Sequence, residues 1–133
     1  QGPITFACRD ADLTIADVTT PPGLRSPAHN HNMWAVIGVY EGQEHNRFYR
    51  HQNGDLHEHG ERLLEQGELV GLEPETIHAI FNPIPTPSSA IHVYGGDLVE
   101  RQNRSMWNPH SLKEEPYDIS RLIEYVREIS EPI

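Results

Sequence analysis

The fold is decided by one stretch of the sequence, Pro27-Ala28-His29-Asn30-His31-Asn32-Met33-Trp34. In an extended segment, side chains two residues apart leave the backbone on the same side, so His29 and His31 form a candidate chelating pair. A third histidine, His78, stands in an apolar run shortly after the turn that Pro74 begins. Each feature alone is weak evidence, because a lone histidine in an apolar run is usually a core residue. Together they predict a metal site with three imidazole ligands.

Size and charge exclude several classes of protein. The 133 residues are enough for one hydrophobic core and predict a single domain. A formal net charge of −10 repels nucleic acids and anionic membrane surfaces alike. No apolar run approaches the roughly 20 residues of a membrane span, and we expect no charged-then-apolar leader before the first expected strand. The single Cys8 cannot form an internal disulfide. We expect a cytoplasmic protein that binds neither nucleic acid nor membrane.

Short strands separated by turn residues fill the sequence up to about residue 94. Asn53-Gly54 is the strongest hairpin signal, and the prolines in 82–87 make that segment a rigid loop. The spacing of the strands is typical of a β-sandwich or a β-barrel. The expected strands are 13–18, the segment with the histidine pair, 35–40, 44–50, 56–64, 68–72, 77–81 and 90–94.

One amphipathic helix is predicted near the end of the chain, over about 118–130. Asp118 is the expected N-cap, and five aliphatic residues follow it at helical spacing. They are Ile119, Leu122, Ile123, Val126 and Ile129. We expect this face of the helix to pack on the strands.

A second His-x-His pair, His57 and His59, competes for the role of metal ligand. It lies in a very polar segment beside the Asn-Gly turn, with no apolar strand to shield it and no third histidine to match. We interpret it as part of a solvated hairpin. His45, His51 and His110 receive the same interpretation.

The order of the three candidate ligands and the surrounding glycines resembles the two sequence motifs of the cupin superfamily. The first motif runs from Gly23 through His29 and His31 to Gly42, and the second runs from Gly67 through Pro74 and His78 to Asn82. The resemblance covers roughly residues 13–98. It implies an all-β fold, the cupin double-stranded β-helix or jelly-roll barrel, over about 4–100 of a single domain spanning 1–133. Many cupins carry a glutamate ligand shortly after His-x-His, but residues 33–36 offer no carboxylate here.

The segment 90–97 resembles one branch of the cupins, the thiol dioxygenases related to cysteine dioxygenase. Those enzymes bind Fe(II) with three histidines, lack the glutamate, and carry a Ser-x-His-x-Tyr group just after the third ligand. Residues 34–39 and 104–107 are also similar to bacterial members. The resemblance implies that Tyr94 donates a hydrogen bond to bound oxygen or substrate and that His92 orients Tyr94.

Two positions depart from that branch. Ala90 stands where the group would have serine, and Ser89 faces the opposite way on a strand. We therefore expect the hydrogen-bond relay that orients His92 to be incomplete. Cys8 is far from the position at which mammalian members cross-link a cysteine to the tyrosine, so no such cofactor is expected.

Three residues are candidates for substrate contact. Arginine grips a carboxylate with two parallel hydrogen bonds, and Arg104 and Arg25 are the basic residues best placed for this. Arg104 is preferred because proteins similar to 3-mercaptopropionate dioxygenase have an arginine at about that distance after the tyrosine group. Trp34, beside the histidine pair, is the third candidate.

The function implied by the resemblance is a mononuclear non-haem Fe(II) dioxygenase. Its substrates would be O2 and a small chelating anion, most simply a thiol acid such as cysteine or 3-mercaptopropionate. Three neutral imidazoles also suit Ni(II), Zn(II) or Cu(II), so the ligands alone leave the metal open. Two alternatives remain: a non-catalytic cupin that senses or stores a metal or small anion, and an isomerase or hydrolase. A homodimer joined through the edge strands is also expected, because unpaired edges need covering.

Overall fold

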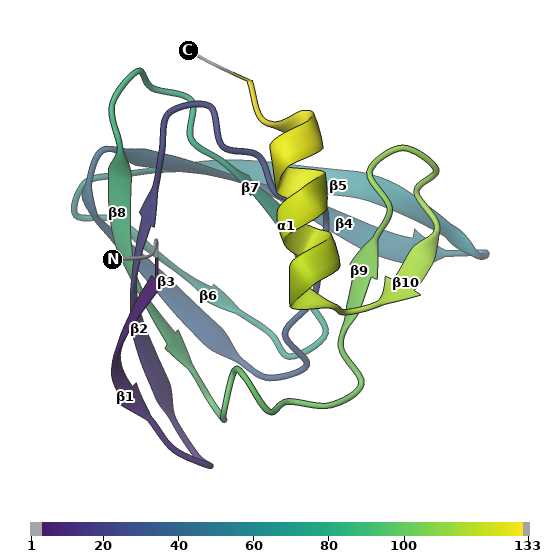
Figure 1. Ribbon diagram of the computed structural model, residues 1–133, viewed down its shortest axis with the longest axis horizontal. Helices are drawn as coiled ribbons and strands as arrows, with labels where there is room; N and C mark the ends of the chain where they lie inside the picture. The colour runs from purple at the N-terminus through teal and green to yellow at the C-terminus, as the bar shows by residue number, and fades with distance from the viewer. Residues whose placement is uncertain (1–3, 132–133) are drawn as a thin grey trace.

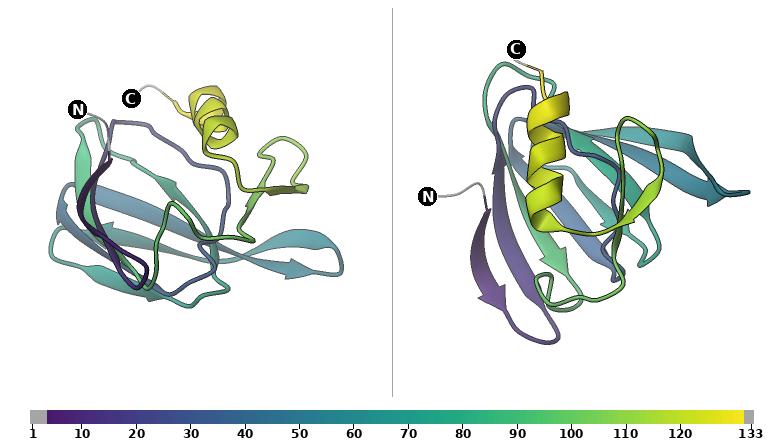
Figure 2. Two further views of the ribbon diagram at one scale, coloured as in Figure 1. Left: turned by 60° about the horizontal axis from the view of Figure 1, so that its bottom comes forward. Right: turned by 45° about the vertical axis from the view of Figure 1, so that its right-hand side comes forward.

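The computed structural model describes residues 4–131, which form an open-ended barrel of antiparallel strands with one helix on its side (Figures 1 and 2). One sheet has the strand order β1-β2-β8-β3-β6, a second has the order β5-β4-β7, and β10 pairs with β9. The strands are β1 Ile4–Arg9, β2 Thr14–Thr20, β3 Ala35–Glu41, β4 Gln43–Gln52, β5 Asp55–Glu65, β6 Leu69–Leu72, β7 Ile77–Phe81, β8 Ser88–Tyr94, β9 Ser105–Trp107 and β10 Glu114–Pro116.

Most of the predicted strands are confirmed, and their boundaries follow the turn signals. β3 and β4 meet at Gly42, whose φ of 77° favours glycine, and a Cβ there would lie 2.5 Å from the Ser88 hydroxyl oxygen. β4 and β5 are joined at Asn53-Gly54, where both φ angles are positive. This is the conformation that an Asn-Gly hairpin turn requires.

One predicted strand is wrong: the segment that carries the histidine pair is not a regular strand. It contacts β7 and β9 only through isolated bridges, His29 with His78 and His29 with Met106. Asn32, directly after the pair, has a φ of 56°, which breaks the extended backbone before β3 begins. β1, β9 and β10 were not predicted.

The core of the barrel is formed mainly by inward-facing residues of the large sheet, with Leu64 contributed by β5 of the other sheet. In β3 the buried positions alternate with partly exposed ones, as expected for a strand with one face on the core. The buried cluster consists of Met33, Ala35, Ile37, Val39, Leu64, Leu72, Ala90 and Tyr94. Asn82 is buried at the start of the proline-rich loop, where its side-chain amide donates to the carbonyls of Thr20 and Thr86.

The helix α1, Ile119–Ile129, is confirmed with its predicted N-cap. The Asp118 carboxylate accepts hydrogen bonds from the backbone N–H groups of Ser120 and Arg121. The predicted apolar face is only partly correct, because Ile119 and Ile123 are exposed. The inner face instead centres on Tyr125, whose hydroxyl donates to Glu115 at 2.6 Å. With 11 residues, α1 is too short to cross a membrane, and no other helix occurs between residues 4 and 131.

Candidate metal centre

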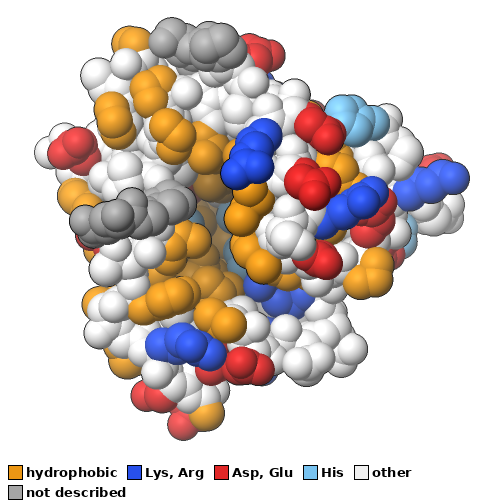
Figure 3. All heavy atoms as spheres, viewed as in Figure 1, with side chains coloured by type: hydrophobic (Ala, Val, Ile, Leu, Met, Phe, Trp, Pro, Cys, Tyr) orange, Lys and Arg blue, Asp and Glu red, His pale blue; other side chains and the backbone are white. Residues whose placement is uncertain are grey.

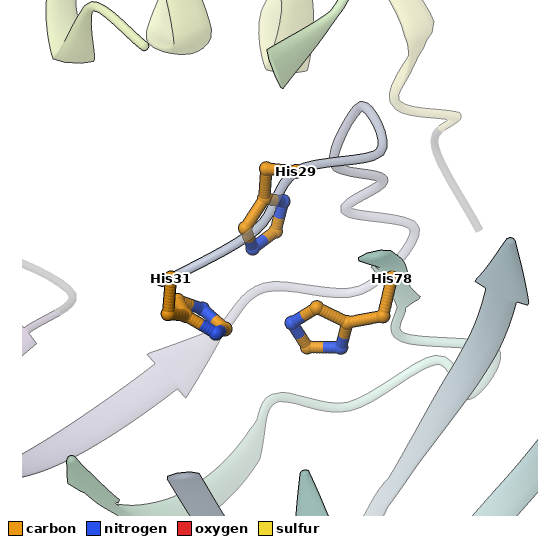
Figure 4. A group of neighbouring side chains, drawn as sticks. All are labelled: His29, His31 and His78. Carbon is orange, nitrogen blue, oxygen red and sulfur yellow. The ribbon is translucent and has the colours of Figure 1, made fainter. Parts of the chain in front are cut away.

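The three predicted ligands come together inside the barrel (Figure 4). Two backbone hydrogen bonds hold His29 against His78 on β7, from His29 N–H to His78 O at 2.9 Å and from His78 N–H to His29 O at 3.0 Å. The ring centroids of His29, His31 and His78 lie 4.8 to 5.1 Å apart, and one nitrogen of each ring lies within 4.8 Å of the others. Within residues 4–131, no Asp or Glu side chain belongs to this group of possible ligands.

Two of the three imidazoles are oriented by hydrogen bonds on the nitrogen that faces away from the centre. His29 donates from Nδ1 to the Pro27 carbonyl, and His78 donates from Nδ1 to the Asn46 side-chain oxygen, each at 2.9 Å. The other nitrogen, Nε2, is then left with a lone pair, as a metal ligand requires. His78 Nε2 is buried and has no hydrogen-bond partner. A metal ion would satisfy this nitrogen, so the residues fit a mononuclear site.

The surroundings keep the three imidazoles neutral. Burial lowers the pKa of His29 to about 4, although its hydrogen bond to Pro27 acts in the opposite direction. Burial also places the pKa values of His31 and His78 well below the usual range, and the neighbouring imidazoles add to this effect. The site is therefore ready to bind a metal ion without first losing protons at neutral pH.

The metal-free protein is expected to lose stability as the pH falls from 6.5 toward about 4. The unfolded chain takes up protons on these histidines in that range while the folded chain does not, so the free energy of unfolding decreases with decreasing pH. Thermal unfolding at several pH values, with a chelator present, measures this dependence. His31→Gln removes one such group and should flatten the curve; an unchanged slope would contradict the assignment.

A buried carboxylate, which sequence analysis missed, lies on β4 beside the centre. Glu44 accepts a hydrogen bond from Asn46 Nδ2 at 2.9 Å, and this fixes the Asn46 oxygen toward His78. Its other oxygen lies 3.6 Å from His92 Nε2, and His92 Nδ1 is 2.8 Å from the Tyr94 hydroxyl. Glu44 thus connects the ligand His78 with the pair formed by His92 and Tyr94.

Glu44 changes the interpretation of Ala90. Ala90 is buried in the barrel core, and Ser89 faces away, toward the Thr19 hydroxyl at 3.1 Å. The relay that orients His92 was therefore expected to be incomplete. His92 Nε2 is indeed buried without a hydrogen-bond partner, but a carboxylate from the neighbouring sheet faces it at 3.6 Å where the serine of its own strand is missing. Burial raises the pKa of Tyr94, which keeps its hydroxyl protonated at neutral pH.

Tyr94 and Arg104 both lie close to the three histidines. The Tyr94 ring centroid is 5.0 Å from that of His31. Arg104 donates from Nε to the carbonyl of Asn30, the residue between the first two histidines, at 3.0 Å. Its guanidinium carbon lies 3.7 Å above the centre of the Tyr117 ring. Its charge contributes to the lowered pKa values of all three histidines.

The other two candidates for substrate contact are not brought to the centre. Arg25 stacks on Phe81, 3.8 Å from the ring centre, and pairs with Glu131 at 3.8 Å. It lines a separate pocket under α1, on the face of β7 opposite His78. Trp34 is 44% exposed and packs directly on Gly95, where a Cβ would collide with the indole ring.

Of the remaining histidines outside the strand β8, all but the partly buried His45 are exposed, as interpreted from the sequence. His57 and His59 are exposed on β5, and His51 is exposed at the end of β4. His45 and His110 face the carboxylates of Glu61 and Glu128, at 3.7 and 2.8 Å. Within the described residues none of these five joins a group that could hold a metal ion.

Comparison with known proteins identifies the fold. No protein-family model matches the sequence. The structure is similar to the DMSP lyase DddQ from Ruegeria pomeroyi DSS-3, with 22% identity and a TM-score of 0.59 over 77% of this chain and 46% of DddQ, so the chain spans less than half of that protein's length. KdgF from a Halomonas species is similar over 72% of this chain and 82% of its own, with 18% identity and a TM-score of 0.57.

A third similar structure is an RmlC-like cupin with a double-stranded β-helix fold from Methanocaldococcus jannaschii. It has 11% identity and a TM-score of 0.55, over 73% of this chain and 82% of its own. Sequence identities this low indicate a shared fold but do not indicate a shared reaction. The chain therefore has the cupin double-stranded β-helix fold that its two motifs predicted, with a three-histidine cluster that could bind a metal inside the barrel.

Proposed function

We propose that this protein is a metal-dependent oxygenase with Fe(II) at His29, His31 and His78 and a small chelating anion as its substrate. The observation that supports it best is the combination of three neutral imidazoles, no carboxylate in the ligand group, and Tyr94 beside His31. Three protein ligands leave coordination positions open for exogenous molecules, as catalytic sites require. A ligand set without negative charge leaves the full charge of the ion to attract an anion.

The preferred substrate is a thiol acid such as cysteine or 3-mercaptopropionate. In this reaction a thiolate and one molecule of O2 form a sulfinate, so both oxygen atoms enter the product and no other reductant is needed. Bound Fe(II) would supply the redox chemistry for O2. Arg104 binds the carboxylate and orients the substrate, since its guanidinium lies next to the histidine segment.

The hydroxyl of Tyr94 and the ring of His92 hold a proton beside the centre. The Glu44 carboxylate lies 3.6 Å from Nε2 of His92, on the side of the ring away from Tyr94. In the tautomer with its hydrogen on Nδ1, His92 donates to the Tyr94 oxygen, and the hydroxyl hydrogen is then free to point at the substrate. Tyr94 in turn supplies a hydrogen bond where negative charge develops on oxygen.

Oxygen consumption by the Fe(II)-loaded protein tests this proposal. We expect uptake of O2 with a thiol acid, with sulfinate formed in equal amount, and no uptake with the zinc-loaded protein. A panel of thiol acids and diketones covers the chelating anions that such a centre would accept. If no compound supports uptake, and the purified protein holds zinc or no metal, the non-catalytic alternative replaces the oxygenase.

Replacing Arg104 by lysine should raise KM for carboxylate substrates and leave the metal content unchanged. A lysine provides a point charge where arginine provides a planar pair of donors, so carboxylate binding is lost more than metal binding. We expect roughly a 10-fold increase in KM, which corresponds to the about 1.4 kcal/mol of one charged hydrogen bond. Arg25→Lys is the matched control, because Arg25 lies on the outer face of β7. Equal kinetics for both variants would remove Arg104 from the site.

A further inference from the structure

An apolar cleft with a volume of 720 Å³ opens on the face of the molecule seen in Figure 3. Hydrophobic side chains surround a hollow in that view, and histidine atoms are visible inside it. Phe6, Val99 and Ile119 line the cleft, from β1, from the segment after β8 and from the start of α1, and all three are more than 40% exposed. Three segments far apart in the sequence therefore expose apolar surface toward one cavity.

Arg104 and Tyr117, whose guanidinium and ring are stacked, also line this cleft. Arg104 is only 9% exposed, and burial lowers its pKa. Two of its donors reach the carbonyls of Asn30, at 3.0 Å, and Leu98, at 3.4 Å. Since a guanidinium has five N–H donors, donors remain for a ligand.

Arg104 has no carboxylate partner in the described chain. The arginine ion pairs within residues 4–131 are formed by Arg9, Arg25, Arg47 and Arg121. Buried charges are normally paired, because an isolated charge loses its hydration without compensation. The residues that line the cleft include Arg101 as well as Arg104 and no acidic residue. The chain as a whole has a net charge of −10, but the charged residues that line this cleft are both basic, so the cleft favours an anionic ligand.

We propose that the cleft binds the hydrocarbon part of an amphipathic carboxylic acid whose carboxylate pairs with Arg104. This deepens the proposed function and rests on it for the reaction, because the same arginine would orient the substrate at the metal centre. The volume of the cleft falls in the range of about 300–1,000 Å³ that is typical of sites for drug-sized ligands, and a three-carbon acid would fill little of it. The substrate class is therefore a chelating acid with an alkyl or aryl substituent.

Binding of plain fatty acids tests the cleft independently of any reaction. Calorimetry with the metal-loaded full chain should show affinity rising from butanoate to octanoate, by about two- to fourfold for each added methylene that is buried. Octanamide and an octyl ammonium salt should bind at least 10-fold more weakly than octanoate, because they carry no negative charge for Arg104. Equal binding of butanoate and octanoate, or of octanoate and octanamide, would overturn the proposal.

Two matched substitutions locate the binding. Val99→Asp places a carboxylate in the cleft at a residue that is 54% exposed, and it should abolish the dependence on chain length. Leu69→Asp changes a residue that is 61% exposed on β6, outside the cleft, and should leave octanoate binding unchanged. If Val99→Asp instead converted a dimer into a monomer without affecting octanoate, the cleft would be an interface between two copies of the chain.

The outcomes separate this proposal from the proposed function. Binding that depends on chain length, without O2 uptake for any thiol acid, would retain the cleft and remove the dioxygenase. Oxygen uptake with 3-mercaptopropionate that does not improve when an alkyl group is added would retain the dioxygenase and remove the cleft as a substrate site.

Discussion

His78→Ala is expected to abolish metal binding while the barrel stays folded. His78 supplies one of three imidazoles, and its Nε2 is buried without a protein hydrogen-bond partner. Losing a ligand should cost more than the about 10- to 100-fold in affinity that losing a hydrogen-bond partner of a ligand costs. Elemental analysis after reconstitution measures metal content, and circular dichroism reports the fold.

Two further variants control this experiment. His57→Ala removes an imidazole from the exposed His-x-His pair on β5 and should leave metal content unchanged. His29→Ala covers the case in which His78→Ala fails to fold, because His29 is less buried and precedes β3 in an irregular segment. Metal lost in His57→Ala and retained in both other variants would show that the ligands lie elsewhere.

Tyr94→Phe is expected to reduce turnover strongly at unchanged metal content. The hydroxyl is hydrogen-bonded to His92 and lies beside His31, but it is not a member of the ligand group. We expect a loss in kcat of about 10²- to 10³-fold, the typical cost of removing a donor from a site of developing negative charge. Steady-state oxygen consumption and metal analysis on the same samples measure both quantities.

Tyr40→Phe is the matched control for this substitution. Tyr40 is 46% exposed and donates its hydroxyl to Asp17 on the outside of the barrel, so its loss should not change turnover. Glu44→Gln tests the connection to His92 and should lower kcat, since the carboxylate faces His92 Nε2 and orients the Asn46 amide toward His78. If Tyr94→Phe behaves like Tyr40→Phe, Tyr94 and His92 are structural residues of the core.

The sequence alone was sufficient for those features that depend on local pattern. The Asn53-Gly54 turn, the alternation in β3 and the Asp118 N-cap are each encoded within a few residues, and each is found in the structure. The grouping of His29 and His31 with the distant His78 was also predictable, because two motifs at that spacing resemble cupins.

The features that only the tertiary structure decided depend on which face of an element is buried. β4 is polar at nearly every position, so its sequence does not indicate that Glu44 and Asn46 face the centre while Arg47 faces outward. In the helix, the sequence does not show which of the aliphatic residues face the barrel. Ile119 is as apolar as the other aliphatic residues of α1, but it lines the cleft and is exposed. Arg25 and Arg104 are chemically the same. Arg104 lies beside the three-histidine cluster because its side chain donates to the carbonyl of Asn30, and a contact between segments so far apart in sequence leaves no local pattern that would reveal it.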